Sequence, residues 1–145
     1  MSRGAILLKP APPFRLDLTV WTLRRRPDNA VDRWDGETYR RVLPLPTGAV
    51  EVAVSQIGRP EIPRLRVTIQ GQALRAPVKA AVIAALERLL GLGIDLAAFY
   101  RFADRQPRLR QLVRRFQGMK PPRFPTVFES LVNAIACQQM TLTLG

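Results

Sequence analysis

Basic side chains are concentrated between Arg101 and Arg123, and they are the residues of this chain best suited to bind an anion. This stretch holds seven arginines and one lysine against one acidic residue, Asp104. The whole chain of 145 residues has a formal net charge of +12. Such an excess indicates a polyanionic partner, with nucleic acid as the first candidate, and each phosphate neutralised would make binding more sensitive to salt. A solvated helix face explains the same arginines equally well at this point.

The residue types that usually carry acid–base, covalent or metal chemistry are scarce. The sequence contains no histidine and one cysteine, Cys137. An intrachain disulfide and a histidine general base are therefore excluded within these residues, and a zinc site nearly so. The carboxylates are scattered, and there is no glycine-rich phosphate loop. We expect no catalytic residue, metal or cofactor in this chain. No stretch is typical of a signal peptide or a membrane span, so the expected location is the cytoplasm.

The stretch that follows Pro125 has a well-marked helix start. Thr126 and Glu129 form a capping box, in which the hydroxyl and the carboxylate each accept a hydrogen bond from a backbone N–H. The apolar face that follows consists of Val127, Phe128, Leu131, Val132 and Ile135. The polar pair Gln138–Gln139 interrupts this face, and few residues remain after it. We expect the helix to lack the partners that its apolar face needs, and the chain to be the N-terminal portion of a longer protein.

Earlier in the chain, three segments alternate between apolar and polar residues, as half-buried strands do. They are residues 37–43, 50–54 and 65–69. The first places Tyr39, Arg41 and Leu43 on one face. Short loops join the segments, which favours an antiparallel sheet with one dry face. Residues 77–90 begin with a proline and carry apolar side chains at helical spacing, so they are predicted to cover that face. The expected fold class is α+β.

The periodicity leaves the first element open. Residues 14–21 alternate as a strand does, but a helix over 17–25 fits as well, since its acidic start and three arginines at its end suit the helix dipole. Further along, Asp95 is predicted to cap a short helix whose inward residues are Leu96, Phe99, Tyr100 and Ala103. Pro107 begins another, whose inward residues are Leu109, Leu112, Val113 and Phe116, and residues 118–125 form a stiff connector.

The stretch from Phe128 to Thr141 resembles a motif of the helix-hairpin-helix DNA glycosylases, F-E-x-L-V-x-A-I-x-x-Q-Q-h-(S/T). Here it reads Phe-Glu-Ser-Leu-Val-Asn-Ala-Ile-Ala-Cys-Gln-Gln-Met-Thr. The segment from Asp95 to Gly118 is similar to the one before that helix in the DNA-3-methyladenine glycosylase II group. The unit before it resembles, more loosely, that group's N-terminal domain, whose fold is TATA-binding-protein-like. The resemblance implies a helix at 17–25, and we expect one there.

The same resemblance implies a division of the chain into three parts. Residues 1–13 would be an extended N-terminal arm, 14–92 the α+β N-terminal domain, and 93–145 the start of an all-α helix-hairpin-helix glycosylase domain. The implied activity is excision of alkylated bases, of the 3-methyladenine type, by base flipping and hydrolysis of the N-glycosidic bond. In that family the hairpin and the catalytic Asp lie downstream, so these 145 residues alone would be inactive.

Site residues follow from the matched positions. A flipped base leaves a hole in the stack that a side chain must fill, and in the family that wedge matches Gln139, with Gln138 beside it. Lys120 and Arg123, the last two cations of the basic stretch, are further candidate DNA contacts. The candidate rim of the base pocket consists of Arg26, Trp21 and Thr22. Thr22 stands where a relative has an aromatic residue, which is a departure from the family pattern. A half-buried core aromatic is the alternative interpretation of Trp21.

The expected partner is damaged double-stranded DNA, bound by a full-length protein that is monomeric and associated with the nucleoid. One alternative is an oxidised-purine glycosylase or lyase of the same superfamily, which a Lys in the downstream hairpin would favour. A second is a basic module without catalytic activity, which binds nucleic acid by shape and charge. A third is a scaffold domain whose exposed helix docks a partner protein.

Overall fold

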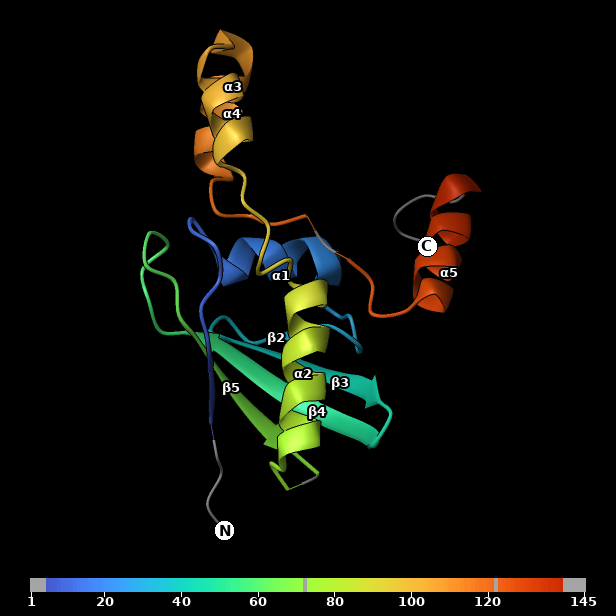
Figure 1. The fold of residues 1–145 in the computed structure, drawn as a ribbon. Coiled ribbons are helices and arrows are strands. Elements are labelled where there is room, and N and C mark those ends of the chain that lie inside the picture. The colour runs from blue at the N-terminus through green and yellow to red at the C-terminus, as the bar shows by residue number, and fades with distance from the viewer. Residues whose placement is uncertain (1–4, 72, 122, 140–145) are drawn as a thin grey trace.

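An antiparallel sheet organises the structure, a computed structural model that describes residues 5–71, 73–121 and 123–139. Within them, the strands occur in the order β1-β5-β4-β3-β2, and every neighbouring pair is antiparallel (Figure 1). Their bounds are Ile6–Leu8 (β1), Arg33–Trp34 (β2), Thr38–Leu45 (β3), Gly48–Gln56 (β4) and Leu65–Gln70 (β5). The prediction of three consecutive antiparallel strands over 37–69 is confirmed.

One face of the sheet is dry, as the alternation predicts. In β4, Val50, Val52 and Val54 are all buried, while the residues between them are half-buried. Helix α2, Ala76–Leu89, lies across this face (Figure 1) and presents a buried stripe of side chains that repeats at four- and three-residue spacing. The stripe consists of Val78, Val82, Leu86 and Leu89. The predicted covering helix is therefore confirmed, with a shift of one residue at each end.

Strand β1 joins the N-terminal arm to the sheet. The sequence predicts that residues 1–13 are extended, and Ile6 and Leu8 are so, but they also pair with Val67 and Leu65 of β5 and are buried. Further along the arm, the N–H of Ala11 donates to the carbonyl of Leu92 at 2.7 Å. The arm therefore adds an edge strand and apolar surface to the core, which its short apolar run does not predict.

The ambiguous first element is a helix, α1, which spans Leu16–Arg24. Leu16, Val20 and Leu23 lie on its buried face at helical spacing. The Oγ1 of the buried Thr19 donates back to the carbonyl of Arg15 at 2.9 Å, so its hydroxyl has a partner within the chain. The resemblance therefore predicts this element correctly where periodicity alone leaves it open.

Helices α3, Ala97–Asp104, and α4, Pro107–Arg115, pair as a hairpin that projects from the rest of the molecule (Figure 1). Asp95 accepts a hydrogen bond from the N–H of Ala97 at 2.8 Å, as its predicted capping role requires. The predicted inward faces are confirmed in part: Ala103 is buried and five of the other residues are half-buried, but Phe99 and Leu112 are 47% and 55% exposed. Each helix has an apolar face, but no described element covers those two residues.

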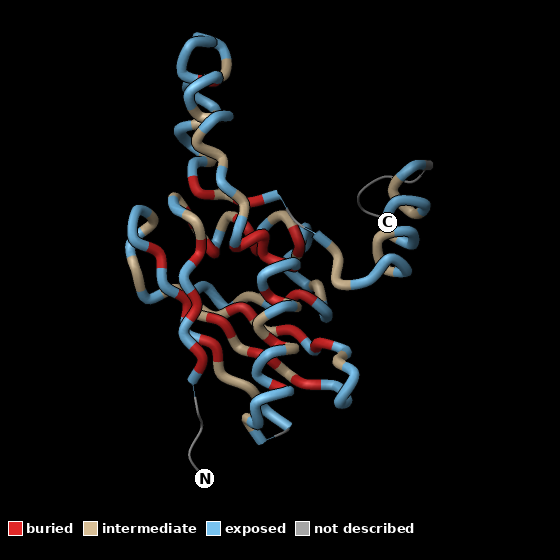
Figure 2. Tube along the Cα trace, viewed as in Figure 1, coloured by how far each residue is buried: buried red, intermediate tan, exposed pale blue. Residues whose placement is uncertain are grey.

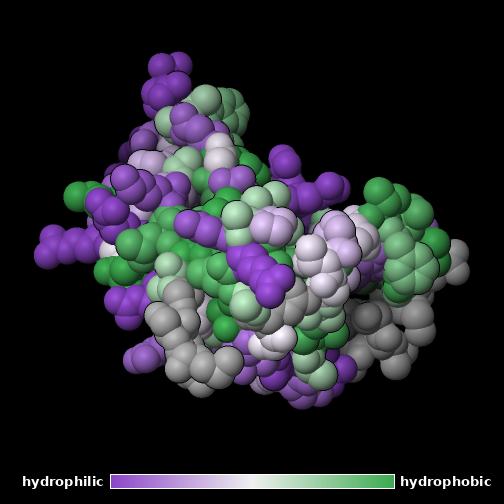
Figure 3. All heavy atoms as spheres, turned by 60° about the horizontal axis from the view of Figure 1, so that its bottom comes forward, coloured by the Kyte–Doolittle hydropathy of each residue, from purple (hydrophilic) through white to green (hydrophobic). Residues whose placement is uncertain are grey.

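Helix α5, Val127–Gln139, stands at one side of the molecule (Figure 1) and is only lightly covered. Its exposed apolar side chains are Val127, Phe128, Leu131, Val132 and Ile135. In Figure 3, hydrophobic residues gather on the lobe that α5 forms at the right. The N–H of Glu129 donates to the Thr126 hydroxyl at 3.1 Å, which confirms one half of the capping box. In the described parts of the chain, no helix is long and apolar enough to cross a membrane.

Candidate nucleic-acid interface

Seven of the eight cations in the basic stretch are exposed, and most lie on the α3–α4 hairpin. They are Arg101, Arg105, Arg108, Arg110, Arg114, Arg115 and Arg123. The guanidinium of Arg110 donates through Nε and Nη2 to the carbonyl of Asp104, at 3.0 and 2.6 Å, and so closes the turn between the helices. The remaining arginines point charge into solvent from a compact hairpin, and this arrangement suits phosphate contact.

Lys120 does not belong to this surface, so its predicted DNA contact is wrong for this structure. The side chain has no exposed surface, and its Nζ donates to the carbonyl of Ile94 at 2.5 Å. Its backbone N–H donates to the Thr19 hydroxyl at 3.2 Å. Burial lowers the pKa of Lys120, while the charge of Asp95 acts in the opposite direction. The ammonium therefore ties the connector to the loop before α3 and is shielded from a phosphate.

The three candidate rim residues do not share one site. Trp21 is 57% exposed, so it is not a half-buried core residue, and its ring stacks on Phe116 with centroids 6.0 Å apart. The Oγ1 of Thr22 donates to the carbonyl of Thr19 at 2.7 Å, which occupies it within α1. Arg26 is exposed and forms an ion pair with Asp28 at 3.3 Å.

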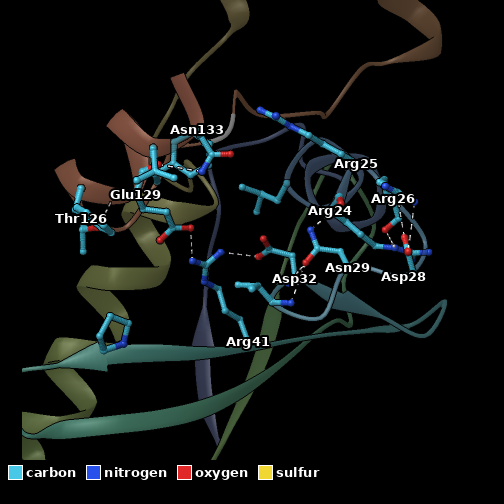
Figure 4. A pocket seen from close by; sticks show the side chains of 16 residues that line it. Arg24, Arg25, Arg26, Asp28, Asn29, Asp32, Arg41, Thr126, Glu129 and Asn133 are labelled. Carbon is cyan, nitrogen blue, oxygen red and sulfur yellow. Dashed lines mark hydrogen bonds and ion pairs between the residues drawn. The ribbon is translucent and has the colours of Figure 1, made fainter. Parts of the chain in front are cut away.

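A hollow of ≈ 630 Å³ lies between α5 and the loop after α1 (Figure 4). Its polar and charged lining consists of Arg24, Arg25, Arg26, Asp28, Asn29, Asp32, Arg41, Thr126, Glu129 and Asn133. Arg26 lines this hollow and also a smaller one of ≈ 260 Å³, which Trp21 borders as well. Thr22 lines neither of these two hollows. The predicted rim is therefore divided: of its three residues, Arg26 lines both hollows, as do its neighbours Arg24 and Arg25.

A buried ion network crosses the large hollow, and we call Tyr39, Asp32, Arg41 and Glu129 the Arg41 network. Arg41 Nη1 donates to Asp32 Oδ1 at 2.8 Å, and Nη2 donates to Glu129 Oε1 at 2.5 Å. The Tyr39 hydroxyl donates to the same oxygen of Asp32 at 2.6 Å. Figure 4 shows the Arg41 guanidinium between the two carboxylates.

The surroundings favour the charged form of Arg41 and the neutral form of Tyr39. Burial alone would lower the pKa of Arg41, but its hydrogen bonds and charge interactions with Glu129 and Asp32 outweigh burial and raise it. Burial, followed by the charge of Asp32, raises the pKa of Tyr39 well above its ordinary value. Asn29 holds the loop that carries Asp32, since its Oδ1 accepts from the N–H of Asp32 at 2.8 Å.

Sequence reasoning places Arg41 on one face of its strand with Tyr39 and Leu43, and the structure shows that this face is buried. It assigns no role to Arg41, however. A charge at a core position of an alternating strand is itself a signal, because a buried charge requires partners. Periodicity identifies neither Asp32 nor Glu129 as the partner of Arg41, since they lie 9 and 88 residues away in other parts of the fold.

The end of α5 carries the predicted wedge. Gln138 is exposed, while the side chain of Gln139 and the motif residues after it lie outside the described residues. One residue earlier, Cys137 accepts a hydrogen bond from Arg25 Nη1 at 3.0 Å, so the Arg25 side chain reaches from the end of α1 to this end of α5. The described residues contain no cluster of His, Cys, Asp or Glu that could hold a metal ion.

The antiparallel sheet, its covering helices and the arginine-rich hairpin together make up the part of the chain that matches a known family. Residues 5–126 match the AlkA N-terminal domain, and the chain belongs to that family. Among solved structures, it is similar to a 3-methyladenine DNA-glycosylase from Archaeoglobus fulgidus, with a TM-score of 0.70 and 27% sequence identity. That similarity covers 97% of this chain and 46% of the archaeal one, so the chain spans less than half of the length of that enzyme. No curated protein matches the chain.

Proposed function

We propose that this chain is the DNA-engaging N-terminal half of a DNA glycosylase that excises alkylated bases, of the 3-methyladenine type, in base-excision repair. The observation that carries the proposal is the match of 97% of the chain to 46% of a 3-methyladenine DNA-glycosylase, together with family membership over residues 5–126. Residues 93–139 are then the first helices of the helix-hairpin-helix domain, and α5 is the helix that approaches the damaged base.

Two surfaces support contact with DNA. The exposed arginines of the α3–α4 hairpin can neutralise phosphates without reading sequence. The polar end of α5 offers Gln138 and Gln139 as bulk and hydrogen bonds for the hole that a flipped nucleotide leaves. The expected ligand is therefore double-stranded DNA with a disrupted base pair, bound by a monomeric full-length protein at the nucleoid without a cofactor.

In this proposal, the residues that hydrolyse the N-glycosidic bond lie outside these 145 residues. Hydrolysis of an N-glycosidic bond needs a carboxylate that stabilises the developing positive charge on the sugar. In the described part of the chain, the buried carboxylate, Asp32, is already occupied by Arg41 and Tyr39. We therefore expect the 145-residue chain to release no methylated adenine from alkylated DNA. Chromatography of the released bases tests this, and measurable release by the pure chain would overturn the division of labour.

A binding experiment tests the proposal directly. Fluorescence anisotropy would compare an intact duplex with the same duplex carrying one stable abasic-site analogue, at about 50 and 200 mM salt. We expect tighter binding to the abasic duplex, and a loss of affinity for both with salt that reaches about 10³-fold if six phosphates are neutralised. The double variant Gln138→Ala/Gln139→Ala should lose the preference, while the matched variant Gln117→Ala, exposed beyond α4, should keep it.

The outcomes separate the functional classes. Affinity that does not fall with salt would reject every DNA-binding interpretation, because phosphate contacts release counterions. Salt-dependent binding with equal affinity for both duplexes would reject the wedge and favour a basic module that binds by shape and charge. A preference for the abasic duplex supports the glycosylase assignment, and the choice among alkylated and oxidised lesions then depends on the domain that follows.

A further inference from the structure

Glu129 departs from its expected role in the capping box. Its backbone N–H donates to Thr126, but its carboxylate binds Arg41 of β3 instead of returning to the start of its own helix. The side chain is 28% exposed, and Arg41 is 4% exposed. A motif residue of α5 is thus used for a contact with the sheet, between positions 88 residues apart.

The sheet side of this contact is firmly held. Arg41 lies on a strand that is paired on both sides, and its second nitrogen binds Asp32, whose side chain is 9% exposed. Tyr39, two residues along the same strand, binds the same Asp32 oxygen. Because arginine presents its donors in a planar fork, fixing one nitrogen on Asp32 also fixes the direction in which the other can bind a carboxylate. The Arg41 guanidinium is therefore a preset anchor.

The helix side has few other supports. Two described hydrogen bonds join α5 side chains to the rest of the molecule, from Arg41 to Glu129 in the first turn and from Arg25 to Cys137 in the last. The apolar face of the helix is largely exposed (Figure 2). A helix of 13 residues is marginal in water without tertiary contacts, so these anchors have a large effect on its order.

We propose that Arg41 is a positioning residue that sets the register and tilt of α5 through Glu129, and so aims the Gln138–Gln139 pair. This inference rests on the proposed function for what the pair does, but not for the anchoring itself. Gln138 lies about 13 Å along the helix axis from Glu129, so a tilt of about 10° at the anchor would move it by about 2 Å. A shift of that size is enough to misalign a side chain with a gap in a base stack.

The sharpest test is Glu129→Gln in the full 145-residue chain. The substitution keeps the shape of the side chain and the backbone N–H that Thr126 caps, and it leaves the contact between Asp32 and Arg41 in place. Amide hydrogen exchange over residues 130–138 should become about tenfold faster, the factor expected when one charge-assisted hydrogen bond is lost. Exchange in β4 should not change. The matched control is Glu87→Gln, on the exposed side of α2, which should leave both regions unaffected.

DNA binding supplies the readout that a purely structural role would not alter. Glu129→Gln should reduce the preference for an abasic over an intact duplex about tenfold, or abolish a smaller one, while affinity for the intact duplex stays at the wild-type value. Glu129→Asp keeps the charge on a shorter side chain and should restore part of the preference. Arg41→Met is less informative, because it leaves Asp32 buried without its cation and can unfold the chain.

The exchange and binding results for Glu129→Gln together distinguish the anchor from the proposed function. Unchanged exchange in α5 overturns the anchor. Faster exchange in a variant that keeps the full abasic preference of the wild type overturns the claim that the anchor aims the glutamine pair. Faster exchange in a protein whose wild type shows no abasic preference supports the anchor and counts against the proposed function. Faster exchange with a reduced preference and partial recovery in Glu129→Asp supports both.

Discussion

The body of the molecule, residues 6–92, and the outer helices α3, α4 and α5 differ in where they place their apolar residues. Every buried hydrophobic residue in the described chain except Ala103 lies within the body. The outer helices hold Phe99, Phe102 and Leu112 and the apolar face of α5 at high exposure. In Figure 2 the buried positions follow the sheet and the inner sides of α1 and α2, while the outer helices are mostly exposed.

The difference in burial shows that residues 6–92 form a hydrophobic core from their own side chains, whereas the outer helices do not. The body closes a sheet against α1 and α2, and the hydrophobic effect of that burial is available within the chain. The outer helices have the amphipathic pattern of packed helices, but their apolar faces are exposed. The chain spans 46% of the archaeal glycosylase to which it is similar.

The largest expected effect contrasts one leucine from each region. Leu86→Ala, on the fully buried side of α2, should lower the free energy of unfolding by about 2–5 kcal/mol, because it removes buried surface and leaves a cavity. Leu131→Ala, on the exposed face of α5, should change it by less than about 0.5 kcal/mol. Urea unfolding followed by circular dichroism measures both, with the slope checked for two-state behaviour. Equal losses would mean that α5 is buried in solution, by self-association or by a different packing.

An intermediate effect is expected where the two regions meet, at Asp32. Asp32→Asn keeps an acceptor for the Tyr39 hydroxyl but removes the charge that Arg41 binds, so it should cost about 1.5–3 kcal/mol. The matched control is Asp17→Asn, whose partner Arg15 lies 2.6 Å away at the surface and whose loss should cost less than about 0.5 kcal/mol. Thermal unfolding at low and high salt separates them further, since screening weakens only the exposed pair substantially. A small cost at Asp32 would show that the Arg41 network is solvated.

The elements of the body that bury one clean face are those that sequence predicts. Strands β3, β4 and β5 and helix α2 follow directly from periods of two and 3.6 residues, because each packs against the other's apolar face. Helix α1 cannot be assigned this way, since Leu16 and Val20 fit both periods. Lys120 shows a different limit, because a lysine in a proline-rich connector gives no sign that its ammonium meets a buried carbonyl.

The candidate site was predictable only in part. The motif around Glu129 identifies α5 as the helix with polar residues at its end, and alternation puts Arg41 on the same face as Tyr39 and Leu43. The contact between them depends on tertiary placement of a loop, a strand and a helix, and local patterns hold no information about it. In the same way, the stack of Trp21 on Phe116 joins α1 to the end of α4 and is visible only in three dimensions.

The smallest expected change in the free energy of unfolding is that of Tyr39→Phe. Its dependence on pH ties this change to the buried phenol in the body of the molecule. Tyr39→Phe removes one hydrogen bond to Asp32 and should cost about 1 kcal/mol at pH 7. Because burial raises the pKa of Tyr39 in the folded state, the unfolded chain loses this proton first as the pH rises above about 10, and stability then falls. At pH 11 that loss is about 1.4 kcal/mol in the wild type and absent in Tyr39→Phe, so the two proteins should become nearly equal in stability.

Lysines titrate in both proteins, and the difference in stability between the two proteins therefore isolates the contribution of Tyr39. Urea unfolding curves at pH 7, 9, 10 and 11 measure this difference, and parallel pH profiles would show that the phenol is open to solvent and that the body is looser around Asp32 than its burial indicates.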